Sequence, residues 1–190
     1  FSNSSAVALE RVAELAGASL QRDQPSLRLA PGTFTLVEGD IRDSQCLDAL
    51  FANAKTFGQP IEAVIHFAGL KAVGESVQQP LRYWDVNAVG TQRLLIAMDK
   101  HHCRTLVFSS SATLYGYPSP DQVPISETAP IQPINPYGAS KHAAESLMAD
   151  VAGCSGNPEP IQASEGDWRI ARLRYFNPVG AHPSGRIGED

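Results

Sequence analysis

Tyr137 and Lys141 lie four positions apart in the segment Tyr-Gly-Ala-Ser-Lys. On a helix this spacing puts both side chains on one face. A phenol titrates near a pKa of about 10, too high for a base at neutral pH, but a nearby ammonium group favours the phenolate. A tyrosine tuned in this way can take a proton from a substrate hydroxyl and return it. The spacing also occurs by chance, and a packed tyrosine beside a solvated lysine is the simpler alternative.

Three serines, Ser109–Ser111, follow the apolar run Thr105–Phe108. A serine at the end of a buried strand is often only a cap or turn former. It can also present a hydroxyl to the helix that follows. Because Tyr137 and Lys141 come next, the order Ser…Tyr-x-x-x-Lys resembles the triad of short-chain dehydrogenase/reductase enzymes, with Ser111 as its serine.

Hydrophobic spacing predicts the elements that must position these residues. Helices are expected over 6–15, 44–57, 81–101 and 137–151, and strands over 33–37, 63–68, 105–108 and 168–175. Proline-rich residues 117–136 are expected to form an irregular functional loop, and residues 153–167 a polar surface loop. The alternation of strand and helix predicts an α/β fold, a doubly wound parallel sheet of the Rossmann-like kind.

In such sheets ligands bind beyond the carboxyl ends of the strands. Four polar or glycine-bearing segments fall at those ends and are expected to converge on one crevice: Gly39–Ile41, Phe67–Gly69, Ser109–Ser111 and Phe176–Pro178.

The composition excludes several classes of protein. Hydrophobic residues make up 43% and charged residues 18% of the 190 residues, as in soluble globular proteins, and the net charge is −5. No apolar run approaches the roughly 20 residues needed to span a bilayer, and no lysine/arginine stripe indicates a nucleic-acid partner. Three widely separated cysteines without a Cys-x-x-Cys pair argue against a disulfide scaffold or a metal site and indicate a reducing, cytoplasmic location.

Three long segments resemble UDP-glucose 4-epimerases of the extended short-chain dehydrogenase/reductase family: His66–Ser76, Phe108–Gly116 and Leu173–Gly185. The resemblance covers nearly the whole chain and is weakest over 153–167. It implies an enzyme with tightly bound NAD that interconverts UDP-galactose and UDP-glucose through a transient 4-keto sugar, in galactose metabolism. Tyr137 would be the base and acid for the C4 hydroxyl, Ser111 would hydrogen-bond or relay that proton, and Lys141 would hold the nicotinamide ribose.

The same resemblance implies the remaining contacts. Asp40 and Ile41 would contact adenine, and Phe176 would pack by the nicotinamide. Asn3 and Ser4 would lie near the adenosine ribose and phosphates, although they are equally explained as helix caps. Cofactor-lining residues would be Phe67, Ala68, Gly69 and Lys71, together with Ser111, Tyr137 and Lys141. Substrate-binding residues would be Lys71, Ser111, Tyr137 and Asn177.

Two features depart from the family pattern. Val86 stands where the family often has the first of two asparagines, so one amide contact to the cofactor is lost. The glycine-rich turn for the pyrophosphate is absent, and the chain starts at Phe1. We therefore expect a piece of a longer protein: residues 1–190 as a partial NAD-binding domain with the catalytic residues, and most of the substrate domain beyond Asp190. Made alone, this chain should fold poorly and turn over little, since a central strand is missing.

Other functions remain open. Nucleotide-sugar 4,6-dehydratases share the fold and the tyrosine/lysine pair but place an acidic pair after the strand-end serine or threonine, where this chain has Ala112 and Thr113. Another NAD-dependent nucleotide-sugar epimerase is a further alternative, as is a non-catalytic NAD-binding protein. By resemblance, the helices over 81–101 and 137–151 would pair two subunits in a homodimer.

Overall fold

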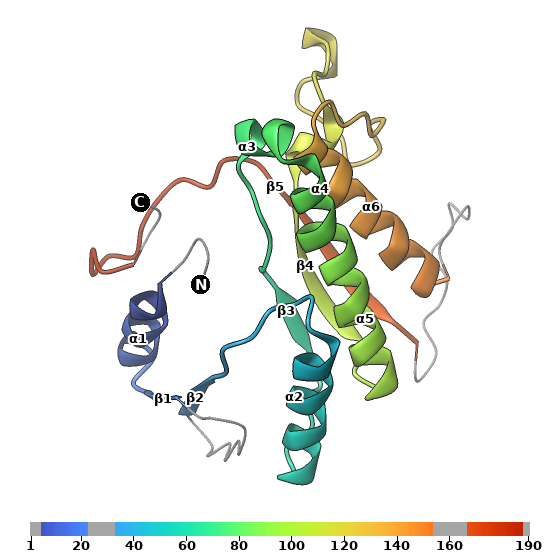
Figure 1. Cartoon of the computed structure of the whole chain (residues 1–190). Helices are drawn as coiled ribbons and strands as arrows, with labels where there is room; N and C mark the ends of the chain where they lie inside the picture. The colour runs from blue at the N-terminus through green and yellow to red at the C-terminus, as the bar shows by residue number, and fades with distance from the viewer. Residues whose placement is uncertain (1–4, 23–32, 154–166, 188–190) are drawn as a thin grey trace. The chain divides into compact units, whose positions relative to one another are not determined.

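The computed structural model describes residues 5–22, 33–153 and 167–187. The chain divides into two units. The first comprises Phe1–Asp40, Gln45–Ile61 and Asn177–Asp190, and the second comprises Ile41–Ser44 and Glu62–Phe176. Figure 1 labels their helices and strands.

The first unit is built from α1 (Ala6–Leu15), β1 (Ser19–Arg22), β2 (Thr33–Leu36) and nearly all of α2 (Ser44–Thr56). The β1 and β2 strands pair in parallel, as expected for this fold class. Ser5 caps α1, since its side chain accepts a hydrogen bond from the Val7 amide. The predicted helices 6–15 and 44–57 are confirmed within two residues at each end.

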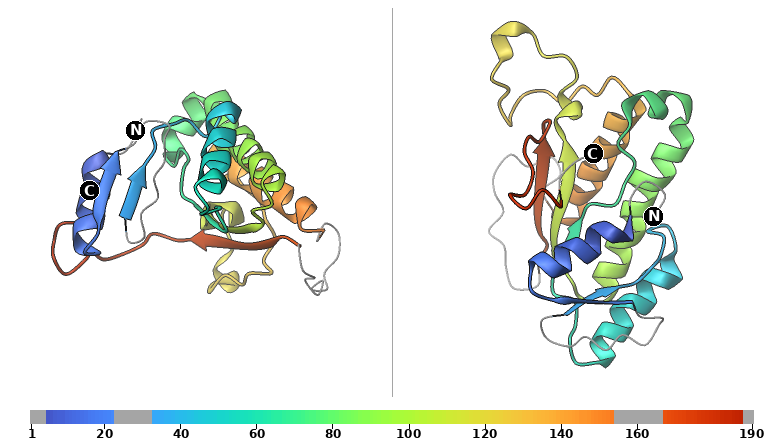
Figure 2. Two further views of the ribbon diagram at one scale, coloured as in Figure 1. Left: turned by 90° about the horizontal axis from the view of Figure 1, so that it is seen from below. Right: turned by 90° about the vertical axis from the view of Figure 1, so that its left-hand side faces the viewer.

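The second unit contains a parallel sheet in the order β3-β4-β5, formed by β3 (Val64–His66), β4 (Thr105–Ser111) and β5 (Arg169–Tyr175). The helices α5 (Gly90–Lys100) and α6 (Pro136–Val151) lie on one side of this sheet (Figure 2). Leu106 and Phe108 of β4 are buried, and the Phe108 ring contacts Lys141 of α6. The parallel pairing confirms the Rossmann-like α/β prediction. β4 extends three residues past the predicted strand, so Ser109–Ser111 belong to it.

The predicted helix over 81–101 is interrupted. The observed elements are α3 (Val73–Gln78), α4 (Pro80–Tyr83), a π-helical segment η1 (Trp84–Val89) and then α5. A π-helical turn contains one residue more than an α-helical turn, which shifts the face on which the following side chains lie. Sequence periodicity did not predict α3, and it predicted residues 84–89 as ordinary α-helix rather than as the π-helical segment η1, which carries the buried Asn87.

A short 3-10 helix, η2 (Ala112–Tyr115), continues directly from β4, and a second one, η3 (Pro120–Gln122), lies in the proline-rich segment. That segment is tied back to η2 at Gly116. Gly116 has φ +65°, and a Cβ there would lie 2.3 Å from the Gln132 carbonyl oxygen. The Gln132 amide donates to the Leu114 carbonyl. The loop therefore returns to the end of β4 just before α6 begins.

Within the described ranges, no helix combines the length and apolar character that crossing a membrane requires.

Candidate functional site

Ser111 is the last residue of β4 and the N-cap of η2. Its Oγ accepts a hydrogen bond from the Thr113 amide (3.2 Å) and donates to Thr113 Oγ1 (2.9 Å). The serine is therefore both a cap, as the simpler interpretation held, and a buried hydroxyl at the carboxyl end of a central strand.

Tyr137 and Lys141 lie in the first turns of α6, as their spacing predicted, and both are buried. The start of this helix is fixed by Asn135, whose side chain accepts from the Gly138 amide at 2.8 Å, and by Pro136 at the first helical position. Both are favourable at a helix start, so the local sequence determines where the tyrosine stands. The predicted alternative of a solvated lysine is wrong, because Lys141 is only 5% exposed.

The Lys141 ammonium is held against β4. Its Nζ donates to the Ser109 carbonyl oxygen at 2.8 Å and lies 4.7 Å from the centre of the Phe108 ring. Burial removes water from the ammonium and lowers the pKa of Lys141 to about 8. At neutral pH the group is still mostly charged, and it supplies a positive charge inside the protein beside the end of β4.

Close backbone packing brings the Ser111 and Tyr137 segments together. A Cβ on Gly138 would lie 3.1 Å from the Thr113 carbonyl oxygen and 3.1 Å from Pro133. A side chain at this position would push η2 and Pro133 away by a few tenths of an ångström, so the glycine favours the close approach of η2 and α6. The β4–η2 segment, which carries Ser111, therefore contacts α6, which carries Tyr137 and Lys141, at two places. Thr113 lies against Gly138, and the Ser109 carbonyl accepts from Lys141.

Asn87 of η1 ties a third element to this pair. Its Oδ1 accepts from the Leu70 amide (2.8 Å), and its Nδ2 donates to the Leu70 carbonyl (3.0 Å) and to Ser140 Oγ (3.1 Å). A Cβ on Gly69 would lie 3.0 Å from Asn87 Oδ1 and 3.4 Å from Lys141 Nζ. The turn after β3 is thereby clamped beside the lysine. Sequence reasoning missed Asn87, although a buried asparagine in an amphipathic helix is a usable signal.

Val86, the departure from the family pattern, has a packing role. It lies against a buried cluster of Leu70, Tyr83 and Tyr137. The Tyr83 and Tyr137 rings meet edge to face, with centroids 6.4 Å apart. An apolar residue at position 86 thus supports the ring of Tyr137 from the π-helical segment.

His66, at the end of β3, is a second buried group near the lysine. The Thr91 hydroxyl donates to the Asn87 carbonyl at 2.6 Å, so the 3.0 Å contact between Thr91 Oγ1 and His66 Nε2 needs the histidine as donor. Burial, reinforced by the positive charge of Lys141, lowers the pKa of His66 to about 3. The imidazole of His66 is therefore neutral at pH 7, so it does not repel the positive charge of Lys141.

The other predicted cofactor residues fall into three groups. Phe67, Ala68 and Lys71 flank Gly69 and are exposed, as is Phe176 after β5. Ile41 packs on the start of α5, where a Cβ on Gly90 would lie 2.8 Å from its Cγ2. Asp40 and Asn177 belong to the first unit, and Asn3 and Ser4 lie outside the described residues. The cofactor and substrate roles expected of all these residues stay predictions.

The chemistry of these groups fits a dinucleotide. The β3 turn has no side chain at Gly69, where a Cβ would lie 3.4 Å from the buried Lys141 ammonium, and Phe67 and Ala68 beside it are exposed. A ribose hydroxyl can accept from Lys141, and a nicotinamide can stack on an exposed apolar surface.

Comparisons with known proteins bear on this site. The model of the family described as GDP-mannose 4,6 dehydratase matches residues 3–156. The chain is 47% identical over 190 residues to a "Bifunctional UDP-glucose 4-epimerase and UDP-xylose 4-epimerase 1" of Pisum sativum, covering 100% of this chain and 47% of the relative. It is 46% identical over 190 residues to a UDP-glucose 4-epimerase of Bacillus subtilis (strain 168), with 100% of this chain and 47% of the relative covered.

The chain is also similar to solved structures of UDP-glucose 4-epimerases. The crystal structure of UDP-glucose 4-epimerase from Bifidobacterium longum in complex with NAD+ and UDP superposes with a TM-score of 0.77 at 42% identity, covering 100% of this chain and 48% of that one. The enzyme from Stenotrophomonas maltophila, with bound NAD and formylated UDP-arabinopyranose, gives 0.76 at 40% identity, over 98% and 46%. The chain therefore spans about half the length of the relatives that it matches.

Proposed function

We propose that the whole protein is an NAD-dependent UDP-glucose 4-epimerase. The chain itself belongs to the family described as GDP-mannose 4,6 dehydratase. One observation carries the proposal: the face of α6 with Tyr137 and Lys141 is buried against the end of β4, with the ammonium bonded 2.8 Å from the Ser109 carbonyl oxygen. The identity of 46–47% to UDP-glucose 4-epimerases along the whole chain supports the same reaction.

In this reaction Tyr137 takes the proton of the sugar C4 hydroxyl and later returns it to the 4-keto sugar. Bound NAD would supply the acceptor for hydride from C4 and the donor for its return to the other face. Ser111 hydrogen-bonds the same oxygen or relays its proton, for which its hydroxyl must turn from Thr113 toward the substrate. Lys141 would bind the nicotinamide ribose through its buried ammonium group.

The remaining roles are part of the proposal. Cofactor contacts are assigned to Asn3, Ser4, Asp40, Ile41, Phe67, Ala68, Gly69, Lys71 and Phe176, and substrate contacts to Lys71 and Asn177. Residues 1–190 would supply the catalytic groups and part of the NAD site, and most of the sugar-binding part would lie elsewhere in the whole protein. Half-length coverage of the relatives supports this division.

A dehydratase is the rival that the family description itself suggests. Removing water from the sugar after oxidation needs a general acid and a general base in addition to the tyrosine. The residues that follow Ser111 are Ala112 and Thr113, and the Thr113 hydroxyl is bonded to Ser111. Neither side chain titrates near neutral pH, so the positions after the strand-end serine favour epimerisation over elimination.

The test is to incubate the purified whole protein with UDP-galactose and to identify the products by NMR. We expect a mixture of UDP-galactose and UDP-glucose with no net oxidation. A 4-keto-6-deoxy product would show a dehydratase instead. Retention of NAD without any conversion of UDP-sugars would show a binding protein and would contradict the proposal.

We also propose that the whole protein is a cytoplasmic homodimer that pairs through the helices over 81–101 and 137–151, which correspond to α4, η1 and α5, and to α6. Leu81 of α4 is 82% and Ile96 of α5 61% exposed, so both leave apolar area that a second subunit could cover. Light scattering of the wild type should give the mass of two chains, and Leu81→Glu should weaken the pairing, whereas Gln92→Glu should not. A monomeric wild type would contradict the dimer.

A further inference from the structure

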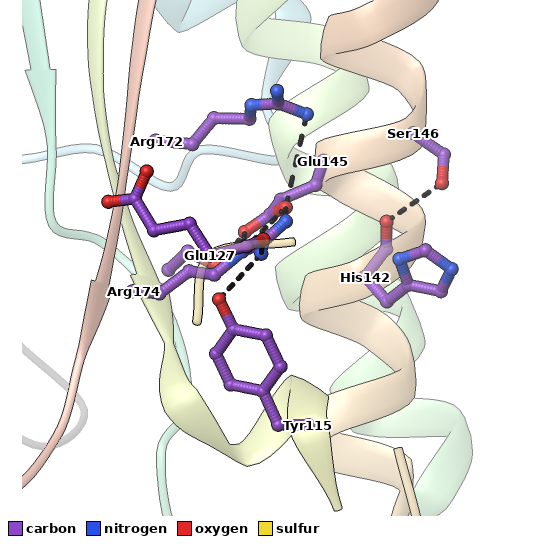
Figure 3. A network of polar contacts seen from close by, with 8 residues as sticks. Tyr115, Glu127, His142, Glu145, Ser146, Arg172 and Arg174 are labelled. Atoms are coloured by element: carbon purple, nitrogen blue, oxygen red, sulfur yellow. Dashed lines mark hydrogen bonds and ion pairs between the residues drawn. The ribbon is translucent and has the colours of Figure 1, made fainter. Parts of the chain in front are cut away.

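Glu145 is a carboxylate in the interior of the second unit, 2% exposed, on the face of α6 that meets the sheet. Arg174 of β5 binds it through two groups: Nη2 lies 2.7 Å from Oε2, and Nε lies 3.1 Å from Oε1 and 3.2 Å from Oε2. Ser110 Oγ donates to Oε1 at 2.5 Å. Figure 3 shows the carboxylate between the helix and the strands, with Arg174 reaching it from β5.

The partners of Glu145 stand next to the reacting groups. Ser110 directly precedes Ser111, and Glu145 lies one helical turn after Lys141 on the same face of α6. One carboxylate therefore fixes the helix that carries Tyr137 and Lys141 to the strand end that carries Ser111.

Arg174 extends this link to two further segments. Its Nη1 donates to the Tyr115 hydroxyl at 2.8 Å and to the Glu127 carbonyl at 3.3 Å (Figure 3), and its guanidinium lies 5.2 Å from the centre of the Tyr115 ring. Tyr115 ends η2, and Glu127 lies in the proline-rich loop. The ends of β4 and β5, α6 and the loop are thus joined by a single arginine–glutamate pair.

We propose that Glu145 and Arg174 are positioning residues for the proposed epimerase reaction: they hold Ser111 and the Tyr137–Lys141 face of α6 in the relative placement that proton and hydride transfer require. This inference rests on the proposed function and adds to it two residues that would act through the catalytic groups rather than by contact with cofactor or sugar.

The chemistry of the pair fits that role better than a role in stability. Burial opposes ionisation of Glu145, but hydrogen bonds from Arg174 and Ser110 outweigh it and hold the pKa of the carboxyl below its ordinary value. Buried ion pairs contribute little net stability, because desolvation offsets their attraction. A fully hydrogen-bonded network does restrict geometry, and errors of about 1 Å at a reacting centre can lower rates about 100-fold.

The test uses Glu145→Gln, Arg174→Lys and Ser110→Ala in the whole protein. Steady-state kinetics, bound NAD and the single-turnover absorbance of reduced nicotinamide are measured for each. For Glu145→Gln and Arg174→Lys we expect kcat and hydride transfer to fall about 10- to 100-fold, because the reacting groups are displaced. KM for the UDP-sugar and the NAD content should stay within about twofold of the wild type, because no binding group is removed. Ser110→Ala deletes one hydrogen bond and should lower kcat about fivefold.

Arg172→Gln is the matched control. Arg172 lies on the same strand and its Nη1 also faces Glu145, but at 3.9 Å and with a side chain that is 41% exposed. It makes an ion pair without a hydrogen bond, so its loss should leave kcat within about twofold. Wild-type kcat in the charge-conserving Arg174→Lys, together with a clear loss in Arg172→Gln, would mean that charge alone matters, which contradicts positioning.

The outcomes distinguish the positioning role of Glu145 and Arg174 from the proposed epimerase function. Wild-type kcat in folded Glu145→Gln and Ser110→Ala, with only a lower melting temperature, would overturn the positioning role and leave the epimerase intact. If Glu145→Gln does not fold, Ser110→Ala decides, since it keeps the ion pair. A wild type without epimerase activity would overturn the proposed function, and this inference with it.

Discussion

At the scale of one residue, the buried charge of Lys141 lowers the stability of the folded protein and serves the proposed reaction. Its ammonium is almost entirely removed from water and keeps one carbonyl acceptor and one aromatic ring as partners. An unfolded lysine titrates at a pKa of 10.5, whereas burial lowers the pKa of Lys141 to about 8. The difference is a destabilisation of the charged form by about 3 kcal/mol.

Replacing this lysine should therefore stabilise the protein while inactivating it. Lys141→Met keeps the volume, removes the buried charge and loses one hydrogen bond of about 1 kcal/mol. We expect the free energy of unfolding at pH 7 to rise by about 2 kcal/mol, with turnover essentially abolished. Urea denaturation and a turnover assay check this; a less stable variant would contradict the desolvation argument.

The lowered pKa of Lys141 also makes the free energy of unfolding depend on pH. Between pH 8 and 10.5 the folded lysine has lost its proton while the unfolded one keeps it, so the lysine lowers stability progressively as the pH falls through that window. Below pH 8 the effect is constant. The stability difference between Lys141→Met and the wild type should therefore shrink as the pH rises from 8 to 10.

Sequence reasoning reached Ser111, Tyr137 and Lys141 because their spacing and order carry chemistry in themselves. It missed Glu145 and Asn87. Each of these polar side chains acts through partners that are 17 to 53 positions away, such as Leu70 for Asn87 and Ser110 for Glu145. Only the tertiary fold brings those partners into contact. The i+4 relation of Glu145 to Lys141 was the one signal available, and it was not used.

At the scale of elements, the segment that joins β4 to α6 determines where Ser111 lies relative to Tyr137 and Lys141. Its path depends on Gly116, which has φ +65° and leaves 2.3 Å between a Cβ and the Gln132 carbonyl oxygen. An alanine there is strained both in its backbone and in its contact. Gly74 in α3 is the opposite case, a helical glycine with no atom within 4 Å of its Cβ position.

These two glycines give a matched pair of variants. Gly116→Ala should lower the free energy of unfolding by about 3 kcal/mol through the steric conflict and the left-handed backbone. Gly74→Ala should raise it by about 0.5 kcal/mol through helix propensity. Thermal melts of both variants check the pair. Equal stability of the two variants would mean that the loop path does not depend on Gly116.

The predicted elements match the observed ones where an element is regular, and they fail where it is not. Periodicity identified α2 and α6 closely because their apolar spacing is uniform. It joined α4, η1 and α5 into one helix, because one extra residue in a turn shifts the pattern too little to read from the sequence.

At the scale of the whole molecule, the face of the β3-β4-β5 sheet opposite α5 and α6 is apolar and exposed. Ile65, Leu173 and Tyr175 are 64%, 39% and 42% exposed, and Phe67 and Phe176 beyond the strand ends are 67% and 63% exposed. An apolar surface of this kind is a site of association in a soluble chain.

We therefore expect the 190-residue chain, made by itself, to bind a hydrophobic dye strongly and to self-associate. Ile65→Thr with Leu173→Thr should reduce both effects, because they remove apolar area without touching the helices. Gel filtration with dye fluorescence checks this. A monodisperse monomer that binds no dye would contradict it, together with the expectation from the sequence that this chain alone folds poorly.

The central claim is that Tyr137 exchanges a proton with the sugar hydroxyl, and Tyr137→Phe in the whole protein tests it most directly. The ring and its contact with Tyr83 remain, and only the hydroxyl is lost. We expect unchanged binding of NAD and UDP-sugar, with turnover of UDP-galactose lower by a factor of about 100 to 10,000. Turnover equal to that of the wild type would contradict the account.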